Sequence, residues 1–237
     1  MKGKVYIIGG AQTWGVSLTT VEEYDPIADK WVKKADMPTA RSMLSSSVVD
    51  EKIYVIGGDK QIWGNSLSTV EEYDPIADKW VKKANMPTAR GWLSASPANG
   101  KIYVFGGENG GQLSTVEEYD PVMNKWAKKA NMPTARNSLS TSTADGKIYA
   151  IGGHVAGGDL SIVEEYNPVT DIWIRKTDML TIRQALSTSV LDGKIYAIGG
   201  YVNSPIFAVE EYTPEGWPFA ISPQGKLSAT WGQQKEK

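Results

Sequence analysis

Short runs of β-branched and aromatic residues alternate along the chain with glycine pairs and proline-containing turns. The run KVYIIGG at 4–10 stops at glycines, and VEEYDP at 21–26 stops at Asp-Pro, where proline cannot donate to a strand ladder. KWVKKA at 30–35 and SMLSSSVV at 42–49 have the character of a third and a fourth strand. Since no window keeps a helical period, the pattern predicts an all-β chain.

This pattern occurs five times. The glycine pairs begin at Gly9, Gly57, Gly106, Gly152 and Gly199, so the period varies only between 46 and 49 residues. Each pair is followed by a loop of variable length and then by VEEYDP, VEEYNP or VEEYTP. Four copies continue to a tryptophan and an arginine, the tryptophans being Trp31, Trp80, Trp126 and Trp173. A repeat of about 40 to 50 residues is typical of propellers and solenoids.

The order of glycine pair, tyrosine, tryptophan and arginine closely resembles the kelch repeat, over practically the whole chain. The resemblance implies a β-propeller with one four-stranded antiparallel blade per repeat. We therefore expect a five-bladed kelch β-propeller that forms a single domain over residues 1–237. Its repeats are expected at approximately 1–41, 42–90, 91–136, 137–183 and 184–222.

The first repeat lacks the small-residue strand that precedes the glycine-pair strand in the other repeats. The segment LSATWG in 227–232 aligns with LSASPANG at 93–100, and it therefore resembles the missing strand. We expect a closing strand at 226–232 to pair with the strand at 4–8, complete the first blade and close the ring. The alternative is that the chain is a part of a six- or seven-bladed parent.

Composition narrows the classes of partner. The 237 residues carry a net charge of −2, which provides no basic field for nucleic acid or for an anionic membrane surface. No apolar run approaches the roughly 20 residues of a membrane-spanning helix. Since the chain has no cysteine, disulfides are excluded and the cellular compartment stays open. We expect a monomer that neither binds nucleic acid nor inserts into a membrane.

Residues that recur in every repeat are expected to serve the blade. The adjacent glutamates of each VEEY segment point to opposite faces of a strand, so they do not form an acid–base pair for one substrate. One glutamate of each pair is expected to meet the arginine of the MPTAR segment or a nearby lysine. His154 is the only histidine, and the cysteine-linked tyrosine of copper-dependent kelch oxidases has no counterpart here. We expect no catalytic residue, metal or cofactor.

The loops after the glycine pairs differ in length, charge and aromatic content, whereas the flanking strands are nearly constant. The kelch resemblance implies that these loops share one face with the connections that carry the arginines. Exposed aromatic side chains on such a face can anchor a peptide or stack on a sugar ring. The alternatives are that the loop tryptophans fold back onto their loops and that the arginines form structural ion pairs. The candidate binding residues are Trp14, Trp63, Trp92, Tyr201, Phe207, Met43, Asn137, Gln184, Arg41, Arg90, Arg136 and Arg183.

These observations favour a non-catalytic module that binds a protein or peptide through the loop face. A second hypothesis is carbohydrate binding or a sugar mutarotase-like activity, because the kelch resemblance extends to a family in which some bacterial propellers, such as sialate mutarotases, act on sugars. A third hypothesis is a structural repeat scaffold without a small ligand. Near identity between repeats indicates internal duplication or deliberate repetition.

Overall fold

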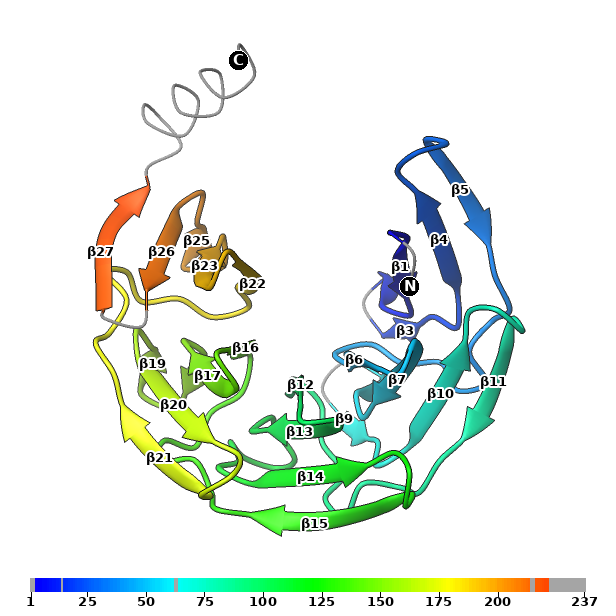
Figure 1. Cartoon of the computed structure of the whole chain (residues 1–237), viewed down its shortest axis with the longest axis horizontal. Coiled ribbons are helices and arrows are strands. Elements are labelled where there is room, and N and C mark those ends of the chain that lie inside the picture. The colour runs from blue at the N-terminus through cyan, green and yellow to red at the C-terminus, as the bar shows by residue number, and fades with distance from the viewer. Residues whose placement is uncertain (1–2, 14, 62–63, 214–215, 222–237) are drawn as a thin grey trace. The chain divides into compact units, whose positions relative to one another are not determined.

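A computed structural model describes residues 3–13, 15–61, 64–213 and 216–221 (Figure 1). The described chain forms five main antiparallel sheets, one for each sequence repeat. Within each main sheet, the strands are hydrogen-bonded to one another in their order along the chain, as in a meander. The first sheet has three strands, β1 (Val5–Ile8), β4 (Val21–Asp25) and β5 (Lys30–Lys33).

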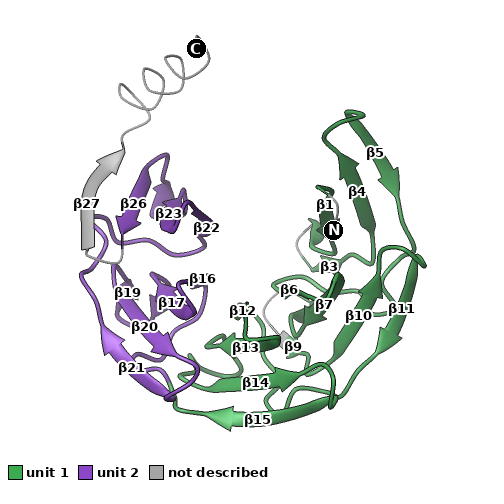
Figure 2. Cartoon of the chain, viewed as in Figure 1, with its two compact units in different colours: residues 1–131 green, residues 132–237 purple. Residues whose placement is uncertain are grey.

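The contacts divide the chain into two compact units, residues 1–131 and 132–237 (Figure 2). The first unit also contains two four-stranded sheets. One consists of β6 (Ser45–Val49), β7 (Lys52–Ile56), β10 (Val70–Asp74) and β11 (Lys79–Lys82). The other consists of β12 (Ser94–Ala98), β13 (Lys101–Phe105), β14 (Val116–Asp120) and β15 (Lys125–Lys129).

The second unit contains the fourth and fifth sheets, each with four strands. The fourth consists of β16 (Ser140–Ala144), β17 (Lys147–Ile151), β20 (Val163–Asn167) and β21 (Ile172–Arg175). The fifth consists of β22 (Ser187–Leu191), β23 (Lys194–Ile198), β26 (Val209–Thr213) and β27 (Gly216–Ile221). The strands expected from the sequence within the described residues are therefore present.

Four of the loops after glycine pairs form small hairpins. Their strands are β2 (Ala11–Thr13) with β3 (Val16–Ser17), β8 (Asp59–Gln61) with β9 (Gly64–Ser66), β18 (His154–Val155) with β19 (Gly158–Asp159), and β24 (Tyr201–Val202) with β25 (Ser204–Pro205). The corresponding loop of the third repeat contains an isolated bridge between Glu108 and Gln112.

The Asp-Pro turns follow directly from local chemistry. In the second repeat, the Asp74 carboxylate accepts backbone hydrogen bonds from Ile76 at 2.9 Å and Ala77 at 3.1 Å. Asp78 adopts a φ of 52° and accepts a 2.6 Å hydrogen bond from the Tyr73 hydroxyl. The turn thereby places Tyr73 opposite Trp80 in the β10–β11 register. These contacts come from the turn itself and from the two strands that it joins.

The arginine that ends each MPTAR or MLTIR segment joins its repeat to the next one. Arg41 is 0% exposed and donates to the carbonyl oxygens of Gly57 and Thr69, both at 2.9 Å. Its Nη2 also lies 2.7 Å from Glu71 Oε2, a carboxylate whose residue is 3% exposed. The arrangement recurs as Arg90–Glu117, Arg136–Glu164 and Arg183–Glu210. The expected structural pairing of glutamate with arginine is confirmed for the second to fifth VEEY segments.

The neighbouring glutamates meet lysines, which was the other expected pairing. Glu72 lies 3.0 Å from Lys83 and Glu165 lies 3.1 Å from Lys176. Because alternate strand positions face opposite sides, each Glu-Glu pair serves two different contacts. This geometry provides no paired acid and base within one Glu-Glu segment.

Two expectations about the ends of the repeat array are not tested. The predicted closing strand at 226–232 lies outside the described residues. The single domain over 1–237 also stays a prediction, because the contacts separate two units between residues 131 and 132.

Candidate functional site

The residue after each arginine bridges to the residue after the next glycine pair. The isolated antiparallel bridges are Ser42–Asp59, Gly91–Glu108, Asn137–His154 and Gln184–Tyr201. Each bridge has a backbone hydrogen bond in both directions, with N···O distances between 2.8 and 3.2 Å. The variable loops and the arginine connections therefore meet, as expected from the kelch resemblance.

The next residue of each connection has a left-handed backbone. Its φ is 50° at Met43, 54° at Trp92, 52° at Ser138 and 49° at Ala185. This conformation is uncommon for residues other than glycine, asparagine and aspartate, yet it recurs with four unrelated side chains. Trp92 N donates to Met43 O at 2.9 Å, and Ala185 N donates to Ser138 O at 2.8 Å. The repeat thus sets the backbone, and the side chain at this position varies.

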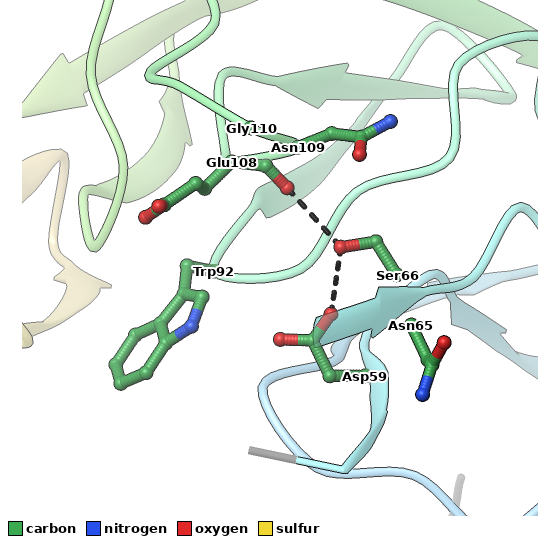
Figure 3. A pocket seen from close by; sticks show the side chains of 7 residues that line it. All are labelled: Asp59, Asn65, Ser66, Trp92, Glu108, Asn109 and Gly110. Carbon is green, nitrogen blue, oxygen red and sulfur yellow. Dashed lines mark hydrogen bonds between the residues drawn. The ribbon is translucent and has the colours of Figure 1, made fainter. Parts of the chain in front are cut away.

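At Trp92 this variable position lines a pocket in the first unit. The pocket has a volume of about 270 Å³ (Figure 3). Three segments form it: the β8–β9 hairpin, the connection between β11 and β12, and the loop after β13. Its lining residues are Asp59, Asn65, Ser66, Trp92, Glu108, Asn109 and Gly110.

Asp59 is the most deeply buried charged group of this pocket, with 3% of its surface exposed. Its Oδ1 accepts a 2.8 Å hydrogen bond from Ser66 Oγ, across the β8–β9 register. Burial raises the pKa of the Asp59 carboxyl, and the negative charge of Glu108 raises it further, while the Ser66 hydrogen bond partly opposes both. The site thus holds a desolvated carboxylate at a defined position.

Gly91 makes room for that carboxylate. A Cβ atom at residue 91 would lie 2.5 Å from Asp59 Oδ2 and 2.6 Å from its Cγ, so any side chain there would require the Asp59 carboxylate to move. The equivalent bridge positions in other repeats carry Ser42, Asn137 and Gln184. The absence of a side chain at residue 91 is therefore specific to the connection that forms this pocket.

The second unit presents its own candidates. Asn137 is buried beside His154, whose Nδ1 lies 2.7 Å from Asp159 Oδ1. Gln184 bridges to Tyr201, which is 45% exposed, and Phe207 is 80% exposed. The structure therefore brings Gln184 and Tyr201 together, and it leaves Phe207 largely open to solvent.

The four arginines lie in the core rather than on a surface. Arg41, Arg90, Arg136 and Arg183 are each 0% exposed, and their guanidinium groups bond to glutamate and to backbone carbonyls. Burial lowers the pKa of Arg41 and Arg90, and it lowers that of Arg136 to about 10. A ligand at the surface does not reach them, so we omit them from the proposed site. Trp14 and Trp63 lie outside the described residues.

The sequence singled out Trp92 but not the residues that surround it. Asp59, Glu108 and Asn109 lie in loops whose variability was visible, yet variability alone does not indicate which loops share a pocket. Gly91 was the available signal, since it replaces larger residues at the equivalent positions. Among the described residues, no group of three or more acidic, histidine or cysteine residues is arranged to hold a metal. No helix in the same part of the chain is long and apolar enough to cross a bilayer.

Comparison with known proteins agrees with the repeat pattern and the sheets. The Kelch motif model matches residues 1–38, 40–87, 94–133 and 135–180, which make up more than half of the chain. Kelch-like protein 35 of Mus musculus is 36% identical over 56 residues, which are 24% of this chain. The aligned part is only 10% of that protein.

A solved structure titled "Structure of YjhT" superimposes with a TM-score of 0.81 at 16% identity. The match covers 94% of this chain and 82% of that one. At this identity the likeness shows the fold, which is all-β with five propeller blades. The repeats, the sheets and the family model lead to one conclusion: the chain belongs to the Kelch motif family.

Proposed function

We propose that this chain is a non-catalytic module that binds a protein or peptide through the face where the variable loops meet the arginine connections. Kelch propellers generally serve as protein-interaction or scaffold modules. The proposal names the surface of this chain on which the ligand would bind. The observation that carries it is the pocket at Trp92, where a repeated backbone presents side chains that differ between repeats.

Two features of the pocket support a peptide or protein ligand. The partly buried indole of Trp92 supplies the kind of rigid aromatic anchor that dominates many interfaces. The surrounding carboxylates and amides of Asp59, Glu108, Asn65 and Asn109 supply hydrogen-bonding groups around it. An apolar anchor with a polar surround is the usual anatomy of a protein-binding site.

A non-catalytic role is supported by the recurring glutamates. Glu71 is engaged by Arg41 and Glu72 by Lys83, and the later repeats show equivalent arginine and lysine contacts. These carboxylates therefore act in the blade. Their recurrence in repeats with different loops agrees with a structural role.

The test is selection from a random peptide library on the wild-type protein, followed by affinity measurement on two variants. Trp92→Ser places at residue 92 the side chain that Ser138 has at the equivalent position, so the backbone is compatible with it. Ile76→Ser is the control, because Ile76 is 78% exposed and lies in the Asp-Pro turn at the far end of β10. We expect selected peptides to lose at least about tenfold in affinity with Trp92→Ser and to keep their affinity with Ile76→Ser. Peptides insensitive to Trp92→Ser would place the binding surface elsewhere.

Carbohydrate binding is the second candidate, and it has a specific observation in its favour. Trp92 lines the same pocket as the amides of Asn65 and Asn109 and the carboxylates of Asp59 and Glu108, a combination that also suits a sugar ring. A glycan array probed with the wild type and Trp92→Ser separates the two candidates. Binding of glycans but not peptides would replace the first proposal, and no binding to either would favour the scaffold hypothesis.

A further inference from the structure

Buried carboxylates in this chain follow one rule. Among the described residues, Glu71, Glu117, Glu164 and Glu210 are at most 3% exposed, and each forms an ion pair with an arginine. Glu118, at 7% exposure, is held by two lysines. Burying a negative charge without a cationic partner is costly, which explains this consistency.

Asp59 departs from the rule. It is as buried as Glu71, with 3% of its surface exposed, yet it forms no ion pair within the described part of the chain. Its Oδ1 accepts the Ser66 hydroxyl, which is a neutral donor. The carboxylate lines the pocket, and the oxygen that does not face Ser66 is free of the dashed hydrogen bonds in Figure 3. Asp59 therefore directs a nearly buried negative charge into an open space.

The rest of the pocket suits a cation. The lining contains a second carboxylate at Glu108 and the indole of Trp92, and none of its described residues is a lysine or an arginine. Figure 3 shows the Glu108 carboxylate on the same side of the pocket as the Trp92 ring, with Asp59 across from them. Indole faces attract cations, and arginine guanidinium groups stack on them readily.

The nearest lysine along the chain does not neutralise the negative charge of the pocket. Lys60 follows Asp59 on β8, and its side chain is exposed. Successive residues of a strand point to opposite faces, so Lys60 extends away from the side that carries Asp59. The pocket keeps its negative character.

We propose that the pocket receives an arginine side chain of the partner, which pairs with Asp59 and stacks on Trp92. This inference rests on the proposed peptide-binding function and names the chemistry of its central contact. The partner's arginine would give Asp59 the ion pair that Arg41 gives Glu71 within the chain. Arginine is favoured over lysine because its planar group can bond a carboxylate in two places while it lies on an aromatic face.

The test uses N-acetylarginine amide as a defined probe, titrated into ¹⁵N-labelled protein and followed by NMR. The citrulline analogue has nearly the same shape without the charge, and the lysine analogue has the charge without the planar fork. We expect shifts at 59–66, 91–92 and 108–110 with arginine, weaker binding of lysine, and no shifts with citrulline. No shifts in these segments with arginine, or equal shifts with citrulline, would overturn the proposal.

Variants identify the groups responsible. Asp59→Asn keeps the acceptor for Ser66 and removes the charge, and we expect it to weaken arginine binding by at least about tenfold. Trp92→Ser tests the stacking surface independently and is expected to weaken binding as well. Glu51→Gln is the control, since it removes one negative charge from the exposed β6–β7 turn and is expected to change affinity by less than about twofold. Unchanged binding in folded Asp59→Asn protein would contradict the proposal.

The outcomes separate this inference from the proposed function. If library-selected peptides depend on Trp92 but lack arginine, and the arginine probe does not bind, the peptide-binding function stands and the arginine inference fails. If no peptide binds and the arginine probe still occupies the pocket, the pocket chemistry stands and the proposed function fails. Selected peptides with one shared arginine, whose replacement by citrulline abolishes binding, would support both.

Discussion

Residues 21–35 and 70–84 have the same sequence, VEEYDPIADKWVKKA, but different surroundings. Both copies form two paired strands of the same lengths, β4–β5 and β10–β11. Glu22 is nevertheless exposed, whereas Glu71 is 3% exposed and paired with Arg41. Identical sequence therefore produces identical local structure and a different energetic role.

The difference comes from the preceding repeat. The second copy follows a repeat that supplies Arg41 to Glu71 and the backbone of Ala35 to Asp78 and Trp80. Among the described residues, Glu22 of the first copy forms no ion pair with an arginine, and Trp31 is 52% exposed. A blade of this chain is thus completed by its neighbour, as is usual in repeat proteins where stability depends on interfaces between adjacent units.

The largest effect is expected at the ion pair between Arg41 and Glu71, which the second copy forms. Glu71→Gln leaves Arg41 buried without a counter-charge, so we expect the free energy of unfolding to fall by about 3–5 kcal/mol. The matched change Glu22→Gln, in the same sequence context, is expected to stay within about 0.5 kcal/mol of the wild type. Chemical denaturation of both variants measures the difference. Equal costs would show that burial by the neighbouring repeat is not the cause.

The next effect concerns the strands beside these copies. Val55 on β7 pairs with Glu71 and is 0% exposed, whereas Ile7, at the equivalent position of β1 opposite Glu22, is 52% exposed. We expect Val55→Ala to cost about 2 kcal/mol or more and Ile7→Ala about 1 kcal/mol or less, as read from denaturant midpoints.

A cost at Ile7 as large as that at Val55 would contradict this expectation. It would favour the ring closure expected from the sequence, in which another sheet covers this face of β1. Deleting residues 226–237 would then remove most of the extra cost at Ile7, because the strand expected at 226–232 is proposed to pair with β1 and close the ring.

A smaller effect tests the tryptophans of the two copies. Trp80 Nε1 donates to Ala35 O at 2.9 Å, whereas Trp31 has 52% of its surface exposed. Trp80→Phe is expected to lose about 1 kcal/mol of stability with the hydrogen bond, and Trp31→Phe only a few tenths. Thermal unfolding of the two variants compares them directly. A larger loss at Trp31 would reverse the proposed order.

The smallest effect is expected in the loops and concerns how stability depends on pH. The residue after the glycine pair is Ala11 in the first repeat and Asp59 in the second. The pKa of Asp59 is raised by burial, so the folded protein binds more protons than the unfolded chain between the ordinary and the raised pKa. Its contribution to stability therefore decreases as pH rises through that window.

Asp59→Asn removes this dependence. We expect the Tm of the variant, relative to the wild type, to increase as the pH is raised from about 3 to about 7. Thermal unfolding across this range checks the sign. A relative Tm that decreases with pH would indicate that ionised Asp59 stabilises the free protein and would weaken the arginine proposal.

Much of the fold could be predicted because its signals are local. The glycine pair after KIYVIGG ends β7, and the Asp74 carboxylate shapes the turn between β10 and β11. Even the pairing of glutamate with arginine was an expectation from recurrence. The pocket could not be predicted in the same way, because Asp59, Trp92 and Glu108 come from three segments whose proximity depends on bridges between repeats.

The sequence by itself determined the strands, the turns and the repeat order, since hydrophobic pattern, glycine and proline act on a few neighbouring residues. Tertiary structure alone decided which of two identical segments buries its glutamate, that the four arginines lie inside, and that Gly91 admits the Asp59 carboxylate. The reason is that burial and charge compensation depend on neighbours far away in the chain. In this protein those neighbours belong to the adjacent repeat.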